Sequence, residues 1–190
     1  MKPTLETRRL TPERWDDFED LFGQRGACAG CWCMYWRLTR KQFQAQKYEG
    51  NRQAMKDLVD SGTVPGLLGY LQGRPVAWCS LAPREDYPSL ARSRILKPLD
   101  DRPCWSVSCL FIERGCRRKG FSVQMLRAAV EHARAQGAKL VEGYPVEPKS
   151  DKPIPAAFAW TGIPSAFLAA GFQEVARRSP TRPIMRISLD

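Results

Sequence analysis

The stretch from Cys104 to Gln136 constrains the fold of this chain more than any other. Its first part, residues 105–112, is an apolar run of the kind that forms a buried strand. Its last part, residues 122–135, carries apolar residues at steps of three and four, which is typical of an amphipathic helix. The basic segment Arg117–Ser122 joins the two parts and contains a glycine. A strand that turns through such a loop into a helix directs backbone N–H groups and the positive end of the helix dipole at one point, so the sequence predicts a phosphate-binding loop.

The size and charge of the chain limit its partners. A chain of 190 residues fits one domain, and we expect a single domain over residues 1–190. The net charge of +10 predicts an acidic partner, such as a phosphate-bearing ligand. The basic residues are scattered, without a basic tail or a long basic helix face, so we expect no nucleic acid as partner. A basic nucleic-acid-binding protein whose glycine loop is incidental is an alternative.

Nothing in the sequence indicates a membrane or secreted protein. No apolar run approaches ~20 residues, and the first residues lack the apolar core of a signal peptide. The seven cysteines are odd in number and irregular in spacing, which favours reduced thiols over a disulfide framework. We therefore expect a cytoplasmic protein that does not bind membranes.

The rest of the chain alternates between helical and strand-like patterns. In order, these predict a strand at 4–10, a helix from 12 to 22, a helix at 41–60, a hairpin at 64–81, an irregular loop at 83–103, a strand at 139–146, a loop at 147–163, a short helix at 164–170, and strands at 173–178 and 183–189. The loop at 147–163 contains Phe158 and Trp160, and we expect it to act as a lid.

A dozen residues, Gly26–Arg37, hold three cysteines at positions 28, 31 and 33. A zinc site needs four ligands, usually as two spaced pairs. Here the spacing is C-x-x-C-x-C without a second pair, and the one histidine, His132, lies on the predicted helix. We therefore expect Cys28, Cys31 and Cys33 to be small packed side chains that bind no metal, with a zinc site as the alternative.

The basic loop resembles the pyrophosphate loop of the GCN5-related N-acetyltransferase (GNAT) superfamily. That loop is written Gln/Arg-x-x-Gly-x-Gly/Ala, and Arg117-x-x-Gly120-x-Ser122 departs from it only at the last position. The ending Gly171-Phe172 of the short helix is similar to the family's step before its last strands. The resemblance extends along nearly the whole chain. It implies a single-domain α/β (mixed α+β) acyl-CoA N-acyltransferase fold, with a mostly antiparallel seven-stranded sheet splayed between its fourth and fifth strands and flanking helices.

The resemblance also implies an activity. The expected reaction is direct transfer of an acetyl group from acetyl-CoA, the cosubstrate, to a primary amine of a small molecule or a peptide. The expected cofactor-binding residues are Phe111, Ile112, Arg117, Arg118, Lys119, Gly120, Phe121 and Ser122. The pantetheine arm would lie in the split and pair with backbone near the first two of these. An inactive CoA-binding sensor of the same fold is the alternative. A homodimer is compatible with either function.

Direct transfer requires that the amine lose a proton and that the thiolate depart. Glu142 and Tyr144 lie on one face of a predicted strand by its two-residue period, and we expect them to be catalytic, with Glu113 as the runner-up. In many family members a tyrosine four residues before the Gly-Phe step protonates the thiolate. Here that position is Phe167, which has no proton to give.

In the resembling family, the loop between the first two helices walls the acceptor pocket. The matching candidates here are Trp32, Tyr35, Trp36 and Arg37. Arg37 can hold a carboxylate through two parallel hydrogen bonds. The alternative is an aromatic cluster with a purely structural role.

Overall fold

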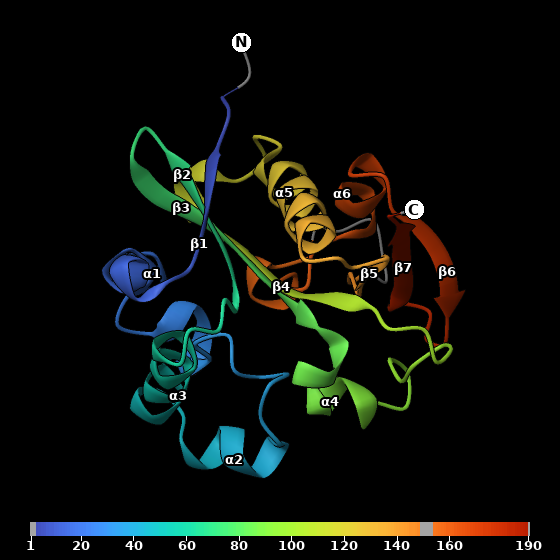
Figure 1. Cartoon of the computed structure of the whole chain (residues 1–190), viewed down its shortest axis with the longest axis horizontal. Helices are drawn as coiled ribbons and strands as arrows, with labels where there is room; N and C mark the ends of the chain where they lie inside the picture. The colour runs from blue at the N-terminus through green and yellow to red at the C-terminus, as the bar shows by residue number, and fades with distance from the viewer. Residues whose placement is uncertain (1–2, 149–153, 190) are drawn as a thin grey trace.

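The computed structural model describes residues 3–148 and 154–189 and is built on one seven-stranded sheet (Figure 1). In chain order the strands are β1 (Glu6–Arg9), β2 (Gly66–Leu71), β3 (Arg74–Pro83), β4 (Trp105–Ile112), β5 (Leu140–Gly143), β6 (Gln173–Arg177) and β7 (Pro183–Ser188). Across the sheet they run β1-β2-β3-β4-β5-β7-β6, and each neighbouring pair is antiparallel except β4 and β5, which are parallel. The predicted mixed α/β fold is confirmed.

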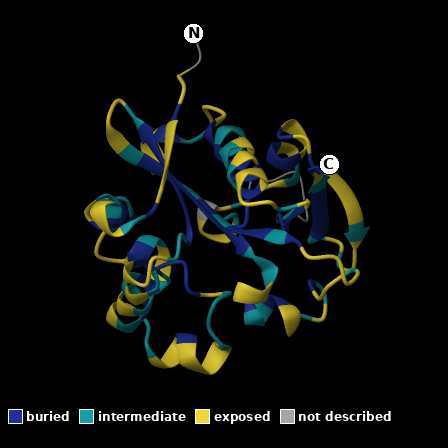
Figure 2. Cartoon of the chain, viewed as in Figure 1, coloured by how far each residue is buried: buried dark blue, intermediate teal, exposed yellow. Residues whose placement is uncertain are grey.

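Helices cover both faces of this sheet. They are α1 (Trp15–Phe22), α2 (Arg40–Ala45), α3 (Glu49–Asp60), α4 (Pro88–Ala91), α5 (Phe121–Ala135) and α6 (Pro164–Ala169). Figure 1 shows α5 and α6 together on one side and α1–α4 on the other. Separate clusters of buried apolar side chains fill the two sides. Figure 2 shows the central strands buried and the edge strand β6 exposed, as expected when both faces of the middle of a sheet are covered.

The predicted helix at 41–60 and the predicted strand at 139–146 differ from the structure. The helix expected at 41–60 is two helices, α2 and α3, because Tyr48 adopts a left-handed backbone with φ of 68°. Gly30 fits against this break, since a Cβ there would lie 2.5 Å from the Tyr48 backbone nitrogen. The strand expected at 139–146 ends at Gly143, because its pairing with β4 and β7 stops there.

Strands β4 and β5 pair over only three residues each, Trp105–Val107 against Val141–Gly143. A bulge in β4 follows directly: Ser80 of β3 opposes Cys109 and Leu81 opposes Val107, so Ser108 is the extra residue. A bulge bends and twists its strand. The two parallel strands therefore part beyond Val107, and the edge of β4 from this point on is not paired with β5.

Phe167 of α6 packs at the end of β5 and is fully buried. Two glycines leave room for its ring. A Cβ at Gly143 would lie 2.1 Å from Phe167 Cε1, and a Cβ at Gly162 would lie 2.7 Å from Cε2. The ring therefore lies against both glycines where β4 and β5 part, and neither position has space for a larger residue.

Gly143→Ala should destabilise the protein by roughly 1–3 kcal/mol, the usual cost of overpacking a core. The reason is the overlap with a buried ring that has no exposed space to move into. Gly115→Ala is the matched control, because a Cβ there meets nothing within 4 Å. Thermal unfolding measures both. Equal melting temperatures for the two variants would contradict the packing described for Phe167.

Candidate functional site

The loop after β4 has the geometry of an anion-binding site. Gly120 stands before α5 in the left-handed conformation, with φ of 80°, and Arg118 is left-handed as well, with φ of 61°. The first bonded amide of α5 is that of Val123, which donates to the Gly120 carbonyl at 3.2 Å. Within the described part of the chain, the amides of Phe121 and Ser122 have no acceptor outside the helix, and a helix leaves its first amides unpaired. No side chain caps this end, so its amides and dipole are available to an anion.

The loop also offers open space and positive charge. Arg118, Lys119 and Gly120 are exposed, and a Cβ at Gly120 would meet nothing within 4 Å. The first turn of α5 contains no acidic side chain that would compete for the amides. The residues of this loop therefore fit a diphosphate group, which combines negative charge with several hydrogen-bond acceptors.

The unpaired edge of β4 adjoins this loop. Glu113 donates its N–H to Val76 of β3 at 2.9 Å, whereas Leu110 donates away from β3, to the Trp160 carbonyl at 2.7 Å. Backbone groups alternate along a strand, so those of Leu110 and Ile112 face the split and those of Phe111 face β3. Arg117 donates from Nε to the Ile112 carbonyl at 2.8 Å, which brings its guanidinium to the end of the split.

Glu142 and Tyr144, the predicted catalytic pair, are hydrogen-bonded to each other within a buried network of charges. The Glu142 carboxylate accepts from the Tyr144 hydroxyl at 2.6 Å, Arg84 Nη1 at 2.7 Å and Arg186 Nε at 2.6 Å. Only 1% of Glu142 is exposed. The Tyr144 hydroxyl lies 2.8 Å from Ser106 Oγ on β4. The buried carboxylate is occupied by these three donors, so this geometry favours a structural role for Glu142.

The network continues outward from β7 to the loop before β4. Arg186 donates from Nη1 to Asp100 at 2.6 Å, and this bond, with Arg102 behind it, holds the pKa of Asp100 well below its usual range. Burial, and then the charge of Glu142, raise the pKa of Tyr144 well above its usual value. Tyr144 is therefore neutral and donates a proton in its hydrogen bond to Glu142.

The variant Glu142→Gln distinguishes a structural role of Glu142 from a role as the catalytic base. If the carboxylate is structural, the change leaves two buried guanidinium groups undercompensated and should cost roughly 3–5 kcal/mol of stability. Glu113, the other candidate base, pairs with Arg74 at the surface. Glu131→Gln is the control, because Glu131 pairs with Arg134 on the exposed side of α5, where an ion pair contributes about 0–1 kcal/mol. Thermal unfolding and kcat are measured for both. A loss of kcat in Glu142→Gln at an unchanged melting temperature would identify it as the base instead.

The aromatic segment after Gly26 divides between core and site. Trp32 is 4% exposed and packs on Phe22, with ring centroids 5.9 Å apart. Tyr35 is 43% exposed and contacts the rings of Trp36 at 4.9 Å and Trp160 at 5.3 Å. Of the predicted acceptor residues, Tyr35 and Trp36 therefore lie beside the segment that contacts β4. Trp32 lies in the core.

Arg37 contacts Tyr87, a residue that the sequence did not single out. Its Nη2 donates to the Pro65 carbonyl at 3.3 Å and to the Tyr87 hydroxyl at 3.2 Å, and its Cζ lies 4.6 Å from the centre of the Tyr87 ring. The Tyr87 hydroxyl also lies 3.1 Å from Ser80 Oγ, next to the bulge in β4. Tyr87 falls in the segment predicted as an irregular loop, where only the following Pro88 marks the start of a helix.

The three cysteines of the segment differ in their burial and hydrogen bonding. Cys28 is exposed, Cys31 is partly buried, and buried Cys33 accepts from Trp78 Nε1 at 3.2 Å. Burial acts to raise the pKa of Cys33, but hydrogen bonds from Cys109, Trp78 and Ser80 outweigh it and lower the pKa to about 7. In the described part of the chain no three His, Cys, Asp or Glu side chains gather as metal ligands would.

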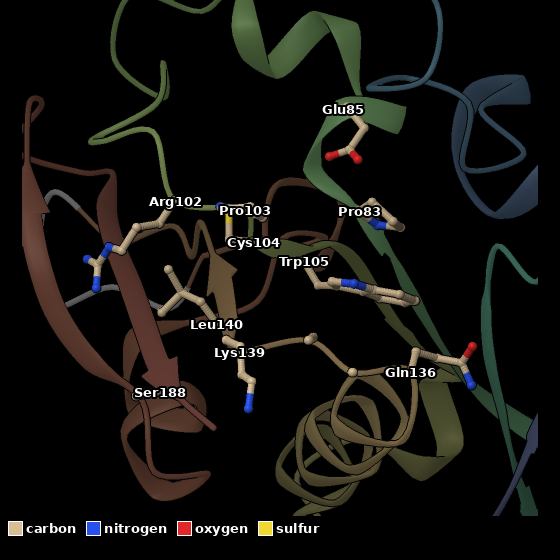
Figure 3. A pocket seen from close by; sticks show the side chains of 12 residues that line it. Pro83, Glu85, Arg102, Pro103, Cys104, Trp105, Gln136, Lys139, Leu140 and Ser188 are labelled. Atoms are coloured by element: carbon tan, nitrogen blue, oxygen red, sulfur yellow. The ribbon is translucent and has the colours of Figure 1, made fainter. Parts of the chain in front are cut away.

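A groove of ≈ 470 Å³ lies at the opposite end of the two parallel strands (Figure 3). Cys104, Trp105 and Leu140, at the starts of β4 and β5, line it, together with Arg102 and Lys139. The basic loop follows the other end of β4, so this groove is separate from the candidate phosphate site. None of the helices in the described part of the chain has the length and apolar character of a membrane-spanning segment.

A mixed sheet that parts between parallel fourth and fifth strands, with an anion-binding turn after the fourth, defines the acyl-CoA N-acyltransferase class of fold. The model of the Acetyltransferase (GNAT) family matches residues 29–150. The chain belongs to this family. No curated protein sequence matches the chain significantly.

Solved structures share the fold at low sequence identity. A GNAT acetyltransferase of Listeria monocytogenes is 11% identical, with a TM-score of 0.58 over 97% of this chain and 95% of that one. The yncA protein of Salmonella typhimurium, solved with its cofactor acetyl-CoA, is 13% identical, with a TM-score of 0.58 over 98% and 95%. The PaiA N-acetyltransferase of Thermoplasma acidophilum, in complex with coenzyme A, is 12% identical, with a TM-score of 0.55 over 97% and 99%.

Proposed function

We propose that this protein is an acetyl-CoA-dependent N-acetyltransferase that transfers acetyl directly to a primary amine. The observation that carries the proposal is the helix terminus at Gly120, with unpaired amides and basic neighbours, at the end of a strand whose edge is free of β5. Two of the related folds hold coenzyme A or acetyl-CoA. Family membership supports the same cosubstrate here.

The chain's own groups have separate tasks in this proposal. The amides of Phe121 and Ser122, with Arg118 and Lys119, bind the diphosphate. The backbone edge of β4 at Leu110 and Ile112 pairs with the pantetheine arm as an added strand would. Acetyl-CoA, when bound, supplies the acetyl group as a thioester. The Leu110 N–H is then the group that can polarise its carbonyl.

The segment before α6 must move in this proposal, because the Trp160 carbonyl takes the Leu110 N–H. Trp160 belongs to the loop expected to act as a lid, of which residues 149–153 lie outside the described part of the chain.

Phe167 cannot protonate the departing thiolate. A thiol pKa of ~8.5 lets the thiolate leave unprotonated near neutral pH. An inactive CoA-binding sensor would use the same loop, and thiol release with a panel of amines separates the two.

Gly120→Glu should abolish acetyl-CoA binding in a folded protein, because its carboxylate would lie at the diphosphate site and repel it. Gly137→Glu is a close control: Gly137 follows the other end of α5, has φ of 81°, and also has nothing within 4 Å of a Cβ. Both variants carry the same backbone strain and charge change. Calorimetry should show binding to Gly137→Glu and none to Gly120→Glu. Equal affinity for the two would sink the assignment of the loop.

Trp160→Ala should tighten acetyl-CoA binding several-fold. Without ring contacts to Tyr35 and Trp36, the segment holds the Leu110 N–H less firmly, so less free energy is spent in displacing it. Phe158→Ala is the control, since Phe158 is in the same segment but is exposed. Calorimetric Kd values compare them. Unchanged or weaker binding in Trp160→Ala would show that the segment does not compete with the cosubstrate.

A further inference from the structure

Arg182, in the turn before β7, is a cation without a counterion beside the expected acceptor site. Its Nη1 donates to Thr161 Oγ1 at 3.0 Å, and it forms no ion pair within the described part of the chain. Burial lowers the pKa of its guanidinium, and the nearby Tyr35 phenol partly offsets this. An arginine stays charged in proteins, so burial leaves this charge poorly solvated.

Two further N–H groups in the same region are buried without an acceptor among the described residues. They are Trp36 Nε1 and Arg37 Nε. The partners of Arg37 are a carbonyl and a hydroxyl, so its charge also lacks a carboxylate. Both of these groups are donors, and a buried donor without an acceptor costs free energy.

The fold neutralises buried arginines elsewhere. Arg84 and Arg186 both bond to Glu142, and Arg186 also bonds to Asp100. Among the residues that the structure describes, Arg37 and Arg182 have no such carboxylate, although desolvation makes an unpaired cation expensive. The lack of a carboxylate partner in the described part of the chain is therefore a feature of this region, and it points to an anion supplied by a ligand.

The contacts place this region at the split. Thr161, which binds Arg182, follows Trp160, whose carbonyl lies on the Leu110 N–H. The Trp160 ring contacts Tyr35 and Trp36. A ligand anion bound by Arg182 therefore lies near the edge of β4, where the proposed function places the thioester.

We propose that the acceptor is an aminocarboxylate, whose carboxylate is bound by Arg182, with Arg37 and the Trp36 indole N–H supporting it. This rests on the proposed function and names its substrate class. An arginine pairs with a carboxylate through strong, charge-assisted hydrogen bonds. The positive surroundings also disfavour an ammonium group, which keeps the amine neutral for attack and rejects polyamines. In the transfer, the amine nitrogen bonds to the acetyl carbon, the C–S bond breaks, and the amine loses one proton to solvent or a base.

The test compares L-amino acids with their carboxamides, and agmatine as an amine without a carboxylate. Thiol release gives kcat/KM, and quenching of tryptophan fluorescence gives binding without turnover. The kcat/KM of each amino acid should exceed that of its carboxamide roughly tenfold to a hundredfold, as expected for hydrogen bonds to a charged group. Arg182→Gln should remove this preference by raising KM for the carboxylate, while the Kd of acetyl-CoA is unchanged. Arg134→Gln, an equal charge change on the exposed end of α5, should retain the preference.

The outcomes separate the two proposals. Failure of acetyl-CoA to bind the natural protein would overturn the N-acetyltransferase, whereas the fluorescence titration would still report on the anion site. Carboxamides or agmatine used or bound as well as the carboxylates would overturn the aminocarboxylate. So would a panel in which no carboxylate is used or bound, or an Arg182→Gln variant that keeps the full preference.

Discussion

Hydrogen bonding between β4 and β5 stops after Val107 and Gly143, and the candidate site depends on this break. The bulge at Ser108 turns β4 away from its parallel neighbour, which leaves the backbone of Leu110 and Ile112 without a strand on the side away from β3. Buried backbone groups need partners. Here the Trp160 carbonyl and the Arg117 side chain provide two, and an extended ligand could replace them as an added strand.

Where β4 and β5 are still paired, a buried network of charged and polar side chains connects them. Glu142 on β5 bonds to Arg84 after β3 and to Arg186 on β7, while Tyr144 reaches Ser106 on β4. Such a network connects four strands at the point where the split begins. A hydrogen-bonded polar network fixes geometry more tightly than apolar packing alone, because each bond has a preferred direction. The split is therefore open at one end and held at the other.

How far the sequence predicted this arrangement depended on the range of each interaction. The strand, basic turn and helix at 105–135 are local, and their pattern predicted the loop geometry around Gly120. The aromatic segment was predicted as one unit, but Trp32 packs in the core and Trp36 at the site, because Gly26 leaves room for the Trp32 ring. Tyr87 and Arg182 were missed, since only the fold brings them near Arg37 and Tyr35.

A crystal structure of the protein with acetyl-CoA tests the central claim most directly. The diphosphate should lie on the amides of Phe121 and Ser122, the pantetheine arm should pair with Leu110 and Ile112, and the Trp160 carbonyl should have left the Leu110 N–H. Binding elsewhere, such as in the groove at the starts of β4 and β5, or a Trp160 carbonyl still bonded to Leu110 beside a fully bound ligand, would contradict it.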